Sequence, residues 1–383
     1  MDFEYQWLLL GLPLAFALGW LFSRLDLRQF KTQDGASPKA YYKGLNLLLN
    51  EQHDKAIDAF IEAVQEDPDT SDLHFALGNL FRRRGEFERA VRVHEHLLNR
   101  ADLPRSERER AQHALAQDFM KAGLFDRAES AYQALEGTAF DTESRLALLT
   151  LHERSRDWRA AVEVAQKLEH RGTGSFASRI SHYWCEIALE ADARQQDDEA
   201  ATALAHARDA APQAARPLVL AGERAARRGD HPEVLQLWGV LMVSHPAAFN
   251  LVARAYAQSA IAAGDRAAAL ERLAPLYERA PSMELLEALT LLDPDPQHRR
   301  DRLLGQLRSH PTLSVAKALI TQRESARFDP DETQALGAAI GRAAKPLHRY
   351  RCAACGFEAV HYFWQCPGCT SWDSYPPQRL EDL

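Results

Sequence analysis

Cysteine is scarce in this 383-residue chain, which excludes the disulfide-stapled class of secreted protein. There are five cysteines, and four of them lie between positions 352 and 369. Glycine and proline, at 19 and 18 residues, are too few for a collagen-like or low-complexity chain. Basic residues are not in excess, because 46 Lys and Arg stand against 54 Asp and Glu, a net charge of −8. The chain therefore has no overall basic field to draw it onto nucleic acid.

Motifs of the common catalytic classes are also absent from the sequence. No phosphate-cradling GxxxxGK[ST], no GxSxG elbow, no HExxH and no dinucleotide fingerprint occurs. Histidines such as His94, His182 and His245 are scattered without ligand spacing, so we expect them at ordinary packing or surface positions. The sequence therefore predicts that this protein is not an enzyme.

One long uncharged run lies near the start of the chain. Residues 5–22 carry no charge, and a helix of that length covers about 27 Å, enough to cross a bilayer. A cleaved signal peptide needs a basic segment before the apolar run, whereas here the basic residues follow it. That order places the N-terminus outside and the bulk of the chain in the cytoplasm. We predict a single-pass membrane anchor at residues 1–23 and a juxtamembrane linker at 24–36; a buried core helix is the alternative.

Small residues follow one face of the predicted anchor. Gly11, Ala15 and Gly19 are spaced four apart, and small residues at this spacing let a second membrane helix approach closely. Such residues are also common in membrane helices that have no partner. We therefore name these three positions as candidate helix-packing contacts and leave the alternative open.

The middle of the chain is rich in Ala, Leu, Glu, Arg and Gln, a composition that predicts helices. A fixed period identifies their arrangement, because Gly78 and Ala90 come 34 residues after Gly44 and Ala56. This is the period of a tetratricopeptide repeat, in which a small residue lets the two helices of a hairpin cross closely. Stacked hairpins then cover each other's apolar faces. The predicted fold is all-α, a tetratricopeptide-repeat superhelix with a transmembrane helix before it and a small metal ribbon after it.

The repeat pattern has a break that we interpret as a domain boundary. Residues 172–175 read GTGS, a composition at which chains commonly bend or divide. We therefore place N-terminal repeats at residues 37–171 and C-terminal repeats at 172–347. The inner surface of such an array can hold an extended peptide or a helix of another protein.

Two clusters of arginine lie at turns of the predicted repeats. Guanidinium groups in such clusters can bind carboxylates or phosphates of a partner, so we name both clusters as candidate protein-binding surfaces. The alternative is a solvated face, because helices of this repeat routinely carry charge at their turns. The clusters are Arg82, Arg83 and Arg84, and Arg224, Arg227 and Arg228.

The cysteine cluster has the spacing C-x2-C-x10-C-x2-C and defines a small domain at residues 348–383. Two residues between cysteines form a tight turn that presents both thiolates to one ion, and two such turns complete a tetrahedral S4 site for zinc or iron. We therefore predict one metal ion bound by Cys352, Cys355, Cys366 and Cys369. A redox disulfide pair is the rival interpretation. Gly356 follows the first pair, whereas Thr370 takes the corresponding place after the second, so the second turn is expected to be less ideal.

A closed shell of four thiolates leaves no coordination position for water or substrate, so the site is structural or transfers electrons. Four-cysteine ribbons also bind nucleic acid in some proteins, but acidic residues offset the arginines of this segment, so we expect no nucleic-acid partner. The fifth cysteine, Cys185, stands alone in a helical repeat and is most simply a buried apolar residue.

The order of these parts resembles the lipopolysaccharide assembly protein B family of Gram-negative bacteria. The resemblance covers essentially the whole chain, and its most specific stretch is YRCAACGFEAVHYFWQCPGC at residues 350–369, which is similar to the family's rubredoxin-like metal domain. Single tetratricopeptide units are not specific to the family.

The resemblance implies a single-pass inner-membrane adaptor with its N-terminus in the periplasm. Such an adaptor helps the membrane protease FtsH degrade the lipid A deacetylase LpxC, thereby limiting lipopolysaccharide synthesis. The resemblance also implies a membrane-embedded regulator that senses lipopolysaccharide, and rubredoxin-type ligation of iron by the four cysteines, with zinc as the alternative. Two other functions stay open at this point. One is an iron redox carrier, and the other is a general scaffold for envelope-assembly enzymes; whether the chain forms a homo-oligomer is also open.

Overall fold

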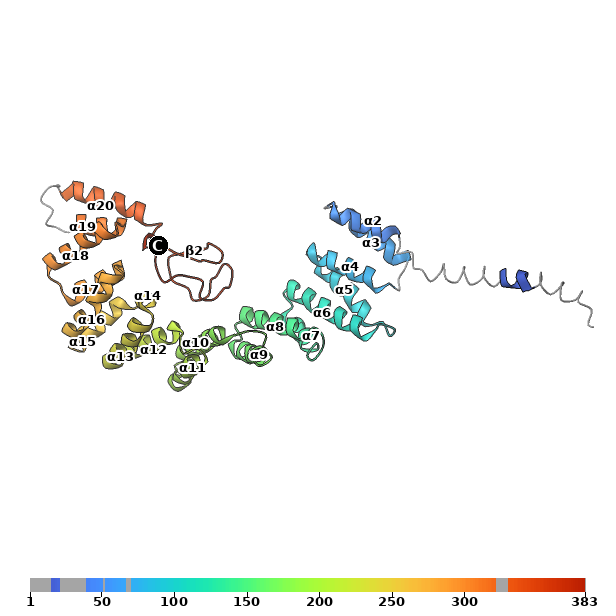
Figure 1. Ribbon diagram of the computed structural model, residues 1–383, viewed down its shortest axis with the longest axis horizontal. Coiled ribbons are helices and arrows are strands. Elements are labelled where there is room, and N and C mark those ends of the chain that lie inside the picture. Colours follow the sequence, from blue (N-terminus) through green and yellow to red (C-terminus); the bar gives the residue numbers. More distant parts are fainter. Residues whose placement is uncertain (1–14, 21–38, 51, 67–69, 322–329, 383) are drawn as a thin grey trace, which may run out of the picture. The chain divides into compact units, whose positions relative to one another are not determined.

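The computed structural model describes residues 15–20, 39–50, 52–66, 70–321 and 330–382 (Figure 1). The chain divides into two compact units, Met1–Arg154 (unit 1) and Ser155–Leu383 (unit 2). This division precedes the GTGS segment, where the sequence predicts the boundary between the two sets of repeats. The helices of both units confirm the predicted repeat architecture, and the ribbon follows it.

The predicted anchor and linker fall mainly on residues outside the described ranges. Residues 15–20 form a helical segment that includes Ala15 and Gly19, whereas Gly11 is not among the described residues. Within the described part of the chain, no helix has both the length and the apolar character needed to cross a bilayer. The anchor at residues 1–23 therefore stays a prediction.

In unit 1, successive helices pack against each other from residue 39 to residue 133. The helices of this unit are α2 (Lys39–Leu49), α3 (His53–Glu66), α4 (Ser71–Arg83), α5 (Phe87–Leu98), α6 (Arg105–Ala122), α7 (Phe125–Gln133) and α8 (Asp141–Ser155), whose last residue lies at the border of unit 2.

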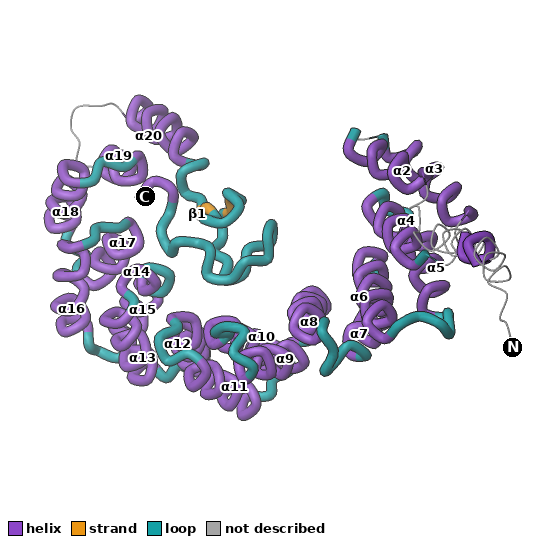
Figure 2. Tube along the Cα trace, turned by 45° about the vertical axis from the view of Figure 1, so that its right-hand side comes forward, coloured by secondary structure: helices purple, strands orange, loops and turns teal. Residues whose placement is uncertain are grey.

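Unit 2 continues the helical hairpins and ends in the four-cysteine segment (Figures 1 and 2). Its helices are α9 (Trp158–His170), α10 (Ala177–Ala193), α11 (Asp197–Ala210), α12 (Ala215–Arg228), α13 (His231–Ser244), α14 (Pro246–Phe249), α15 (Ala253–Ala262), α16 (Arg266–Arg279), α17 (Met283–Leu292), α18 (Pro296–Ser309), α19 (Leu313–Ile320) and α20 (Pro330–Ala344). The strands β1 (Tyr350–Arg351) and β2 (Glu358–Ala359) and the short 3-10 helix η1 (Leu380–Asp382) follow. We call residues 348–382 the metal module.

The periodic glycines hold the paired helices together, as the sequence predicted. A Cβ atom on Gly44 would lie 2.9 Å from the ring of Phe60, and one on Gly78 would lie 2.5 Å from the ring of His94. The corresponding Cβ on Gly222 would enter the indole of Trp238. In each pair the large residue comes sixteen positions after the glycine, on the second helix of the hairpin. The second helix therefore places its largest buried side chain against the bare backbone of the first.

Glycine also ends the helices where the sequence indicated turns. Gly123 follows α6 with φ 76°, and Gly229 follows α12 with φ 75°. Only glycine adopts this left-handed conformation without a steric penalty from a side chain. The chain can then reverse within a few residues and start the second helix of the hairpin.

Candidate metal centre

Two tight turns carry the four cysteines of the metal module. The first turn, with Cys352 and Cys355, joins β1 to the antiparallel β2. The second turn, with Cys366 and Cys369, is closed by a single antiparallel bridge. Both turns belong to one compact ribbon, which therefore presents two pairs of thiols from opposite sides.

The two turns have the same backbone hydrogen bonds. The amide of Gly356 donates to the carbonyl of Cys352 at 2.8 Å, and the amide of Thr370 donates to the carbonyl of Cys366 at 2.8 Å. Both donor residues have a left-handed backbone conformation, with φ 77° for Gly356 and 58° for Thr370. A residue with a Cβ loses about 1–2 kcal/mol in this conformation, whereas glycine loses nothing. The backbone strain thus lies at the turn where the sequence lacks glycine.

The four sulfur atoms lie at the separation expected around one metal ion. All of them fall within 4.8 Å of one another; Cys352 and Cys369 are 3.8 Å apart, and Cys355 and Cys366 are 3.7 Å apart. A tetrahedral ion with metal–sulfur bonds of about 2.3 Å requires sulfur–sulfur separations of about 3.8 Å. The donor set fits a single ion, confirming the predicted four-cysteine metal site. Such an ion would cross-link the two turns.

Hydroxyl groups support three of the four sulfurs. Ser374 Oγ lies 3.3 Å from the sulfur of Cys352, Ser371 Oγ 3.4 Å from that of Cys369, and the hydroxyl of Tyr375 3.8 Å from that of Cys366. The hydroxyl and amide of Ser371 lower the pKa of the Cys369 thiol below its usual value. Because a metal binds the thiolate, the contacts with Ser371 favour the ligating form of Cys369.

Aromatic side chains enclose the ribbon and give it a small core. Cys352 and Cys366 are buried together with Tyr350 and Tyr375, and the ring of Tyr362 packs edge-on against Tyr350 at 5.6 Å. Burial also raises the pKa of Tyr362 well above its usual value. The predicted apolar shell is therefore present, and it surrounds the buried half of the metal site.

Trp372 fixes the metal module on the repeats of unit 2. Its indole stacks on the ring of His182 in α10, with centroids 4.6 Å apart and an angle of 15°. It also meets the rings of Tyr183 and Trp158 edge-on, at 6.0 and 6.3 Å. Aromatic pairs of this kind contribute about 0.5–1.5 kcal/mol each beyond the burial of their area. Trp372 of the module is thus packed among three rings of the repeats, on α9 and α10.

A carboxylate completes this contact. One oxygen of Asp373 accepts a hydrogen bond from Ser178 Oγ at 2.8 Å and lies 2.7 Å from Nε2 of His182. Arg216 of α12 is buried beside them, pairs with Glu186 at 2.6 Å and approaches the faces of Trp364 and Trp372 within 6 Å. The metal module therefore contacts α10 and α12 through both apolar and charged groups.

Sequence reasoning missed the residues of this contact. His182 was assigned to ordinary packing, and it is indeed buried, but its partner lies 191 residues away in the chain. Asp373 and Arg216 were not singled out at all. No local sequence pattern predicts such a pair, because residue spacing along a helix indicates only which side chains of that same helix lie close together. The one signal was the density of aromatic residues beside the cysteines, more than a ribbon of this length needs for its own core.

The first arginine cluster is partly built into the repeats of unit 1. Arg82 donates to Asp118 at 2.8 Å, and Asp118 in turn bonds His94 at 2.5 Å; Asp118 and His94 are fully buried. Arg84 pairs with Asp54, whereas Arg83 is exposed. Arg82 therefore links successive hairpins.

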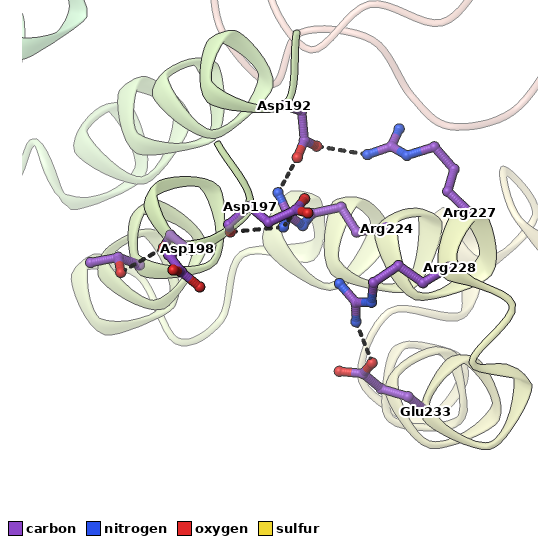
Figure 3. A network of polar contacts seen from close by, with 8 residues as sticks. Asp192, Asp197, Asp198, Arg224, Arg227, Arg228 and Glu233 are labelled. Atoms are coloured by element: carbon purple, nitrogen blue, oxygen red, sulfur yellow. Dashed lines mark hydrogen bonds and ion pairs between the residues drawn. The ribbon is translucent and has the colours of Figure 1, made fainter. Parts of the chain in front are cut away.

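The second cluster surrounds a cavity of about 700 Å³ in unit 2. Figure 3 shows Asp192 between Arg224 and Arg227, both of which donate to it. The side chain of Arg224 is 6% exposed, whereas Arg227 is 59% exposed and Arg228, which pairs with Glu233 at 2.6 Å, is 48% exposed. Partner binding by either cluster stays a prediction, and the exposed members are the ones that can take part in it.

Comparisons with known proteins agree with both parts of the fold. A family model described as a rubredoxin metal-binding domain matches residues 350–376, and one for a tetratricopeptide repeat matches 73–109. The chain is 32% identical to lipopolysaccharide assembly protein B of Escherichia coli (strain K12), over 97% of this chain and 98% of that protein. It is 27% identical to the protein of the same name from Haemophilus influenzae (strain ATCC 51907 / DSM 11121 / KW20 / Rd), over 97% of each.

Two solved structures match parts of this chain at low similarity. YrrB, described as a TPR protein with an unusual peptide-binding site, matches 51% of this chain and 96% of its own at 15% identity and a TM-score of 0.34. A structure of Naa15/Naa10 bound to HypK-THB matches 80% of this chain and 46% of that one at 14% identity and a TM-score of 0.42.

Proposed function

This chain belongs to the lipopolysaccharide assembly protein B family, and on that premise we propose that it is an inner-membrane adaptor. It promotes degradation of the lipid A deacetylase LpxC by the membrane protease FtsH, and so limits lipopolysaccharide synthesis. The name of its relatives supports a role in lipopolysaccharide assembly, and the repeats support binding of other proteins.

The observation that carries the proposal is a closed metal site docked on a repeat array. Four protein sulfurs would hold an ion bound here, and a tetrahedral ion with four such ligands has no position open for substrate. In the described ranges, no other group of three or more metal-ligating side chains comes together. A closed, structural metal site of this kind suits a protein that positions other proteins.

An adaptor needs no catalytic group for this task. A protease and its substrate held on one chain meet at an effective concentration set by their tether, which reaches millimolar values for short flexible links. The repeats provide a docking surface, and the predicted anchor at residues 1–23 confines the chain to the membrane in which the protease lies. A membrane-embedded regulator that senses lipopolysaccharide would contact the anchor at Gly11, Ala15 and Gly19.

The metal has a structural role in this proposal. Ligation by Cys352, Cys355, Cys366 and Cys369 closes both turns of the module, and iron is the ion that the family's rubredoxin-like domain implies. With the turns closed, Trp372 and Asp373 are held in position to contact α10. Metal loading would thereby maintain the shape of the docking surface on unit 2.

Depletion of the protein in cells tests the proposal. The amount of LpxC, measured by immunoblot, should rise on depletion, and it should rise no further when FtsH is already inactive. A matched control restores the full chain from a plasmid, which should return LpxC to its original amount. An unchanged amount of LpxC on depletion would refute the adaptor function.

A further inference from the structure

Unit 2 contains a second cavity, separate from the one beside the arginine cluster. It has a volume of about 480 Å³ and is formed by α15, α17, α18, α19 and the C-terminal part of the metal module. Both Figures 1 and 2 place the C-terminal end of the chain beside α19, and Ser314 Oγ of α19 donates to Glu381 at 2.5 Å. The cavity is thus lined by residues of both the repeats and the metal module.

The floor of this cavity is apolar. Leu286 of α17 is buried there, and Met283, Leu291 and Ala318 are partly buried around it. These side chains also pack against the main hydrophobic core of unit 2, which holds them in position. An apolar side chain of a ligand could therefore insert without first ordering the site.

The carboxylates at the rim of the cavity are already paired. Glu284 pairs with Arg379 at 2.8 Å, Glu287 with Arg254 at 3.6 Å, and Glu381 with His348 at 3.3 Å. Each pair joins two groups of the cavity wall itself. No carboxylate of the rim is left over to attract a basic ligand.

Two cations of the rim, by contrast, are left without a carboxylate. Arg299 on α18 and Lys317 on α19 both line the cavity and are exposed. Among the residues that the structure describes, neither has an ion pair or a side-chain hydrogen bond. They lie on different helices and line the same cavity as the apolar side chains, so positive charge stands beside an apolar surface. The ammonium of Lys317 also lies near α20, 3.2 Å from the position that a Cβ on Gly341 would take.

We propose that this cavity is a docking site for an acidic peptide segment of a partner protein. One apolar side chain of the segment enters between Met283, Leu286, Leu291 and Ala318, and flanking carboxylates pair with Arg299 and Lys317. An extended segment fits a repeat surface of this kind, because such arrays bind peptides along their concave side. The proposal rests on the adaptor function and adds to it the chemistry that a client or protease segment must present.

The test measures peptide binding to the purified full-length protein in detergent by fluorescence anisotropy. The probe is a fluorescein-labelled peptide, Gly-Asp-Leu-Glu-Phe-Asp-Leu-Gly, and its matched control replaces each Asp by Asn and the Glu by Gln. The test variant carries Arg299→Glu with Lys317→Glu. The control variant carries Arg279→Glu with Arg308→Glu, which makes the same change of net charge at exposed positions outside the cavity.

We expect saturable binding of the acidic peptide, weakened at least about tenfold in the test variant because like charges then face each other, and unchanged in the control variant. The neutral peptide should bind about tenfold more weakly than the acidic one. A second variant, Ala318→Phe, should block the floor, and its thermal unfolding shows whether it folds. Absent or unsaturable binding, equal affinity for both peptides, or equal affinity of the test variant and the unchanged protein would overturn the proposal. The adaptor function fails on a different result, an unchanged amount of LpxC after depletion.

Discussion

Replacing Gly222 by Ala should destabilise unit 2, because the added Cβ would enter the indole of Trp238. Trp238 is 1% exposed, and its Nε1 donates to the carbonyl of Val219 at 3.3 Å, so the ring cannot move without displacing buried neighbours. Overpacking of this kind costs about 1–3 kcal/mol, and a rigid ring places it at the upper end. Alanine recovers about 1 kcal/mol of helix propensity relative to glycine, which leaves a net loss of about 2 kcal/mol.

Gly239 of α13 provides the matched control. A Cβ there would meet no atom within 4 Å, so Gly239→Ala should add about 1 kcal/mol through helix propensity alone. For a unit of this size, each kcal/mol shifts the midpoint of thermal unfolding by about 2–4 °C. Circular dichroism of the full-length protein in detergent should thus show a fall of about 4–8 °C for Gly222→Ala and a rise of about 2–4 °C for Gly239→Ala.

A second substitution separates the clash from other effects. Trp238→Leu should lower stability on its own because it leaves a cavity, yet it should remove most of the additional loss caused by Gly222→Ala. If Gly222→Ala unfolds at the same temperature as Gly239→Ala or above it, the close approach of glycine and indole does not organise these hairpins, and the reasoning is refuted.

The remaining predictions concern the metal module. Cys352→Ser with Cys355→Ser should release the ion and make the module sensitive to protease while the repeats keep their helical content; an equally resistant module would contradict a structural ion. Thr370→Gly should relieve the left-handed strain and stabilise the metal-loaded module by about 1 kcal/mol, visible as slower transfer of the ion to a chelator. Burial, with Glu284 and Glu381 nearby, raises the pKa of Asp382 to about 6, so its contribution to stability is present at low pH and lost as pH rises through 6. The protection factor of the η1 amides, which is the exchange rate corrected for its intrinsic rise with pH, should therefore be lower at pH 8 than at pH 5, and Asp382→Asn should reduce this difference; an undiminished difference would show that another group is responsible.

The repeats could be predicted because their determinants are local. The offset between Gly44 and Ala56 recurs at Gly78 and Ala90, and each such position acts within one hairpin. The cysteine site could be predicted for the same reason, since two matched short turns suffice to bring four sulfurs together. In both cases the residues that contact each other lie close together in the sequence, within one hairpin or between residues 352 and 369.

The contact between module and repeats could not be predicted in this way. His182 and Asp373 are 191 residues apart, and neither side chain carries a pattern that names the other. The arginine clusters show a related limit, because Arg224 and Arg227 are similar in sequence context, yet only Arg224 is buried. Burial of a single turn residue depends on how the next hairpin stacks, which the period alone does not specify.

Reconstituted proteolysis tests the adaptor function most directly. FtsH in proteoliposomes should degrade purified LpxC with a lower KM when this protein is present in the same membrane, and with little change in kcat, because the adaptor raises local substrate concentration without altering the protease. Omission of FtsH should leave LpxC intact. Degradation of LpxC at the same rate with and without this protein, or in its presence when FtsH is absent, would contradict the account.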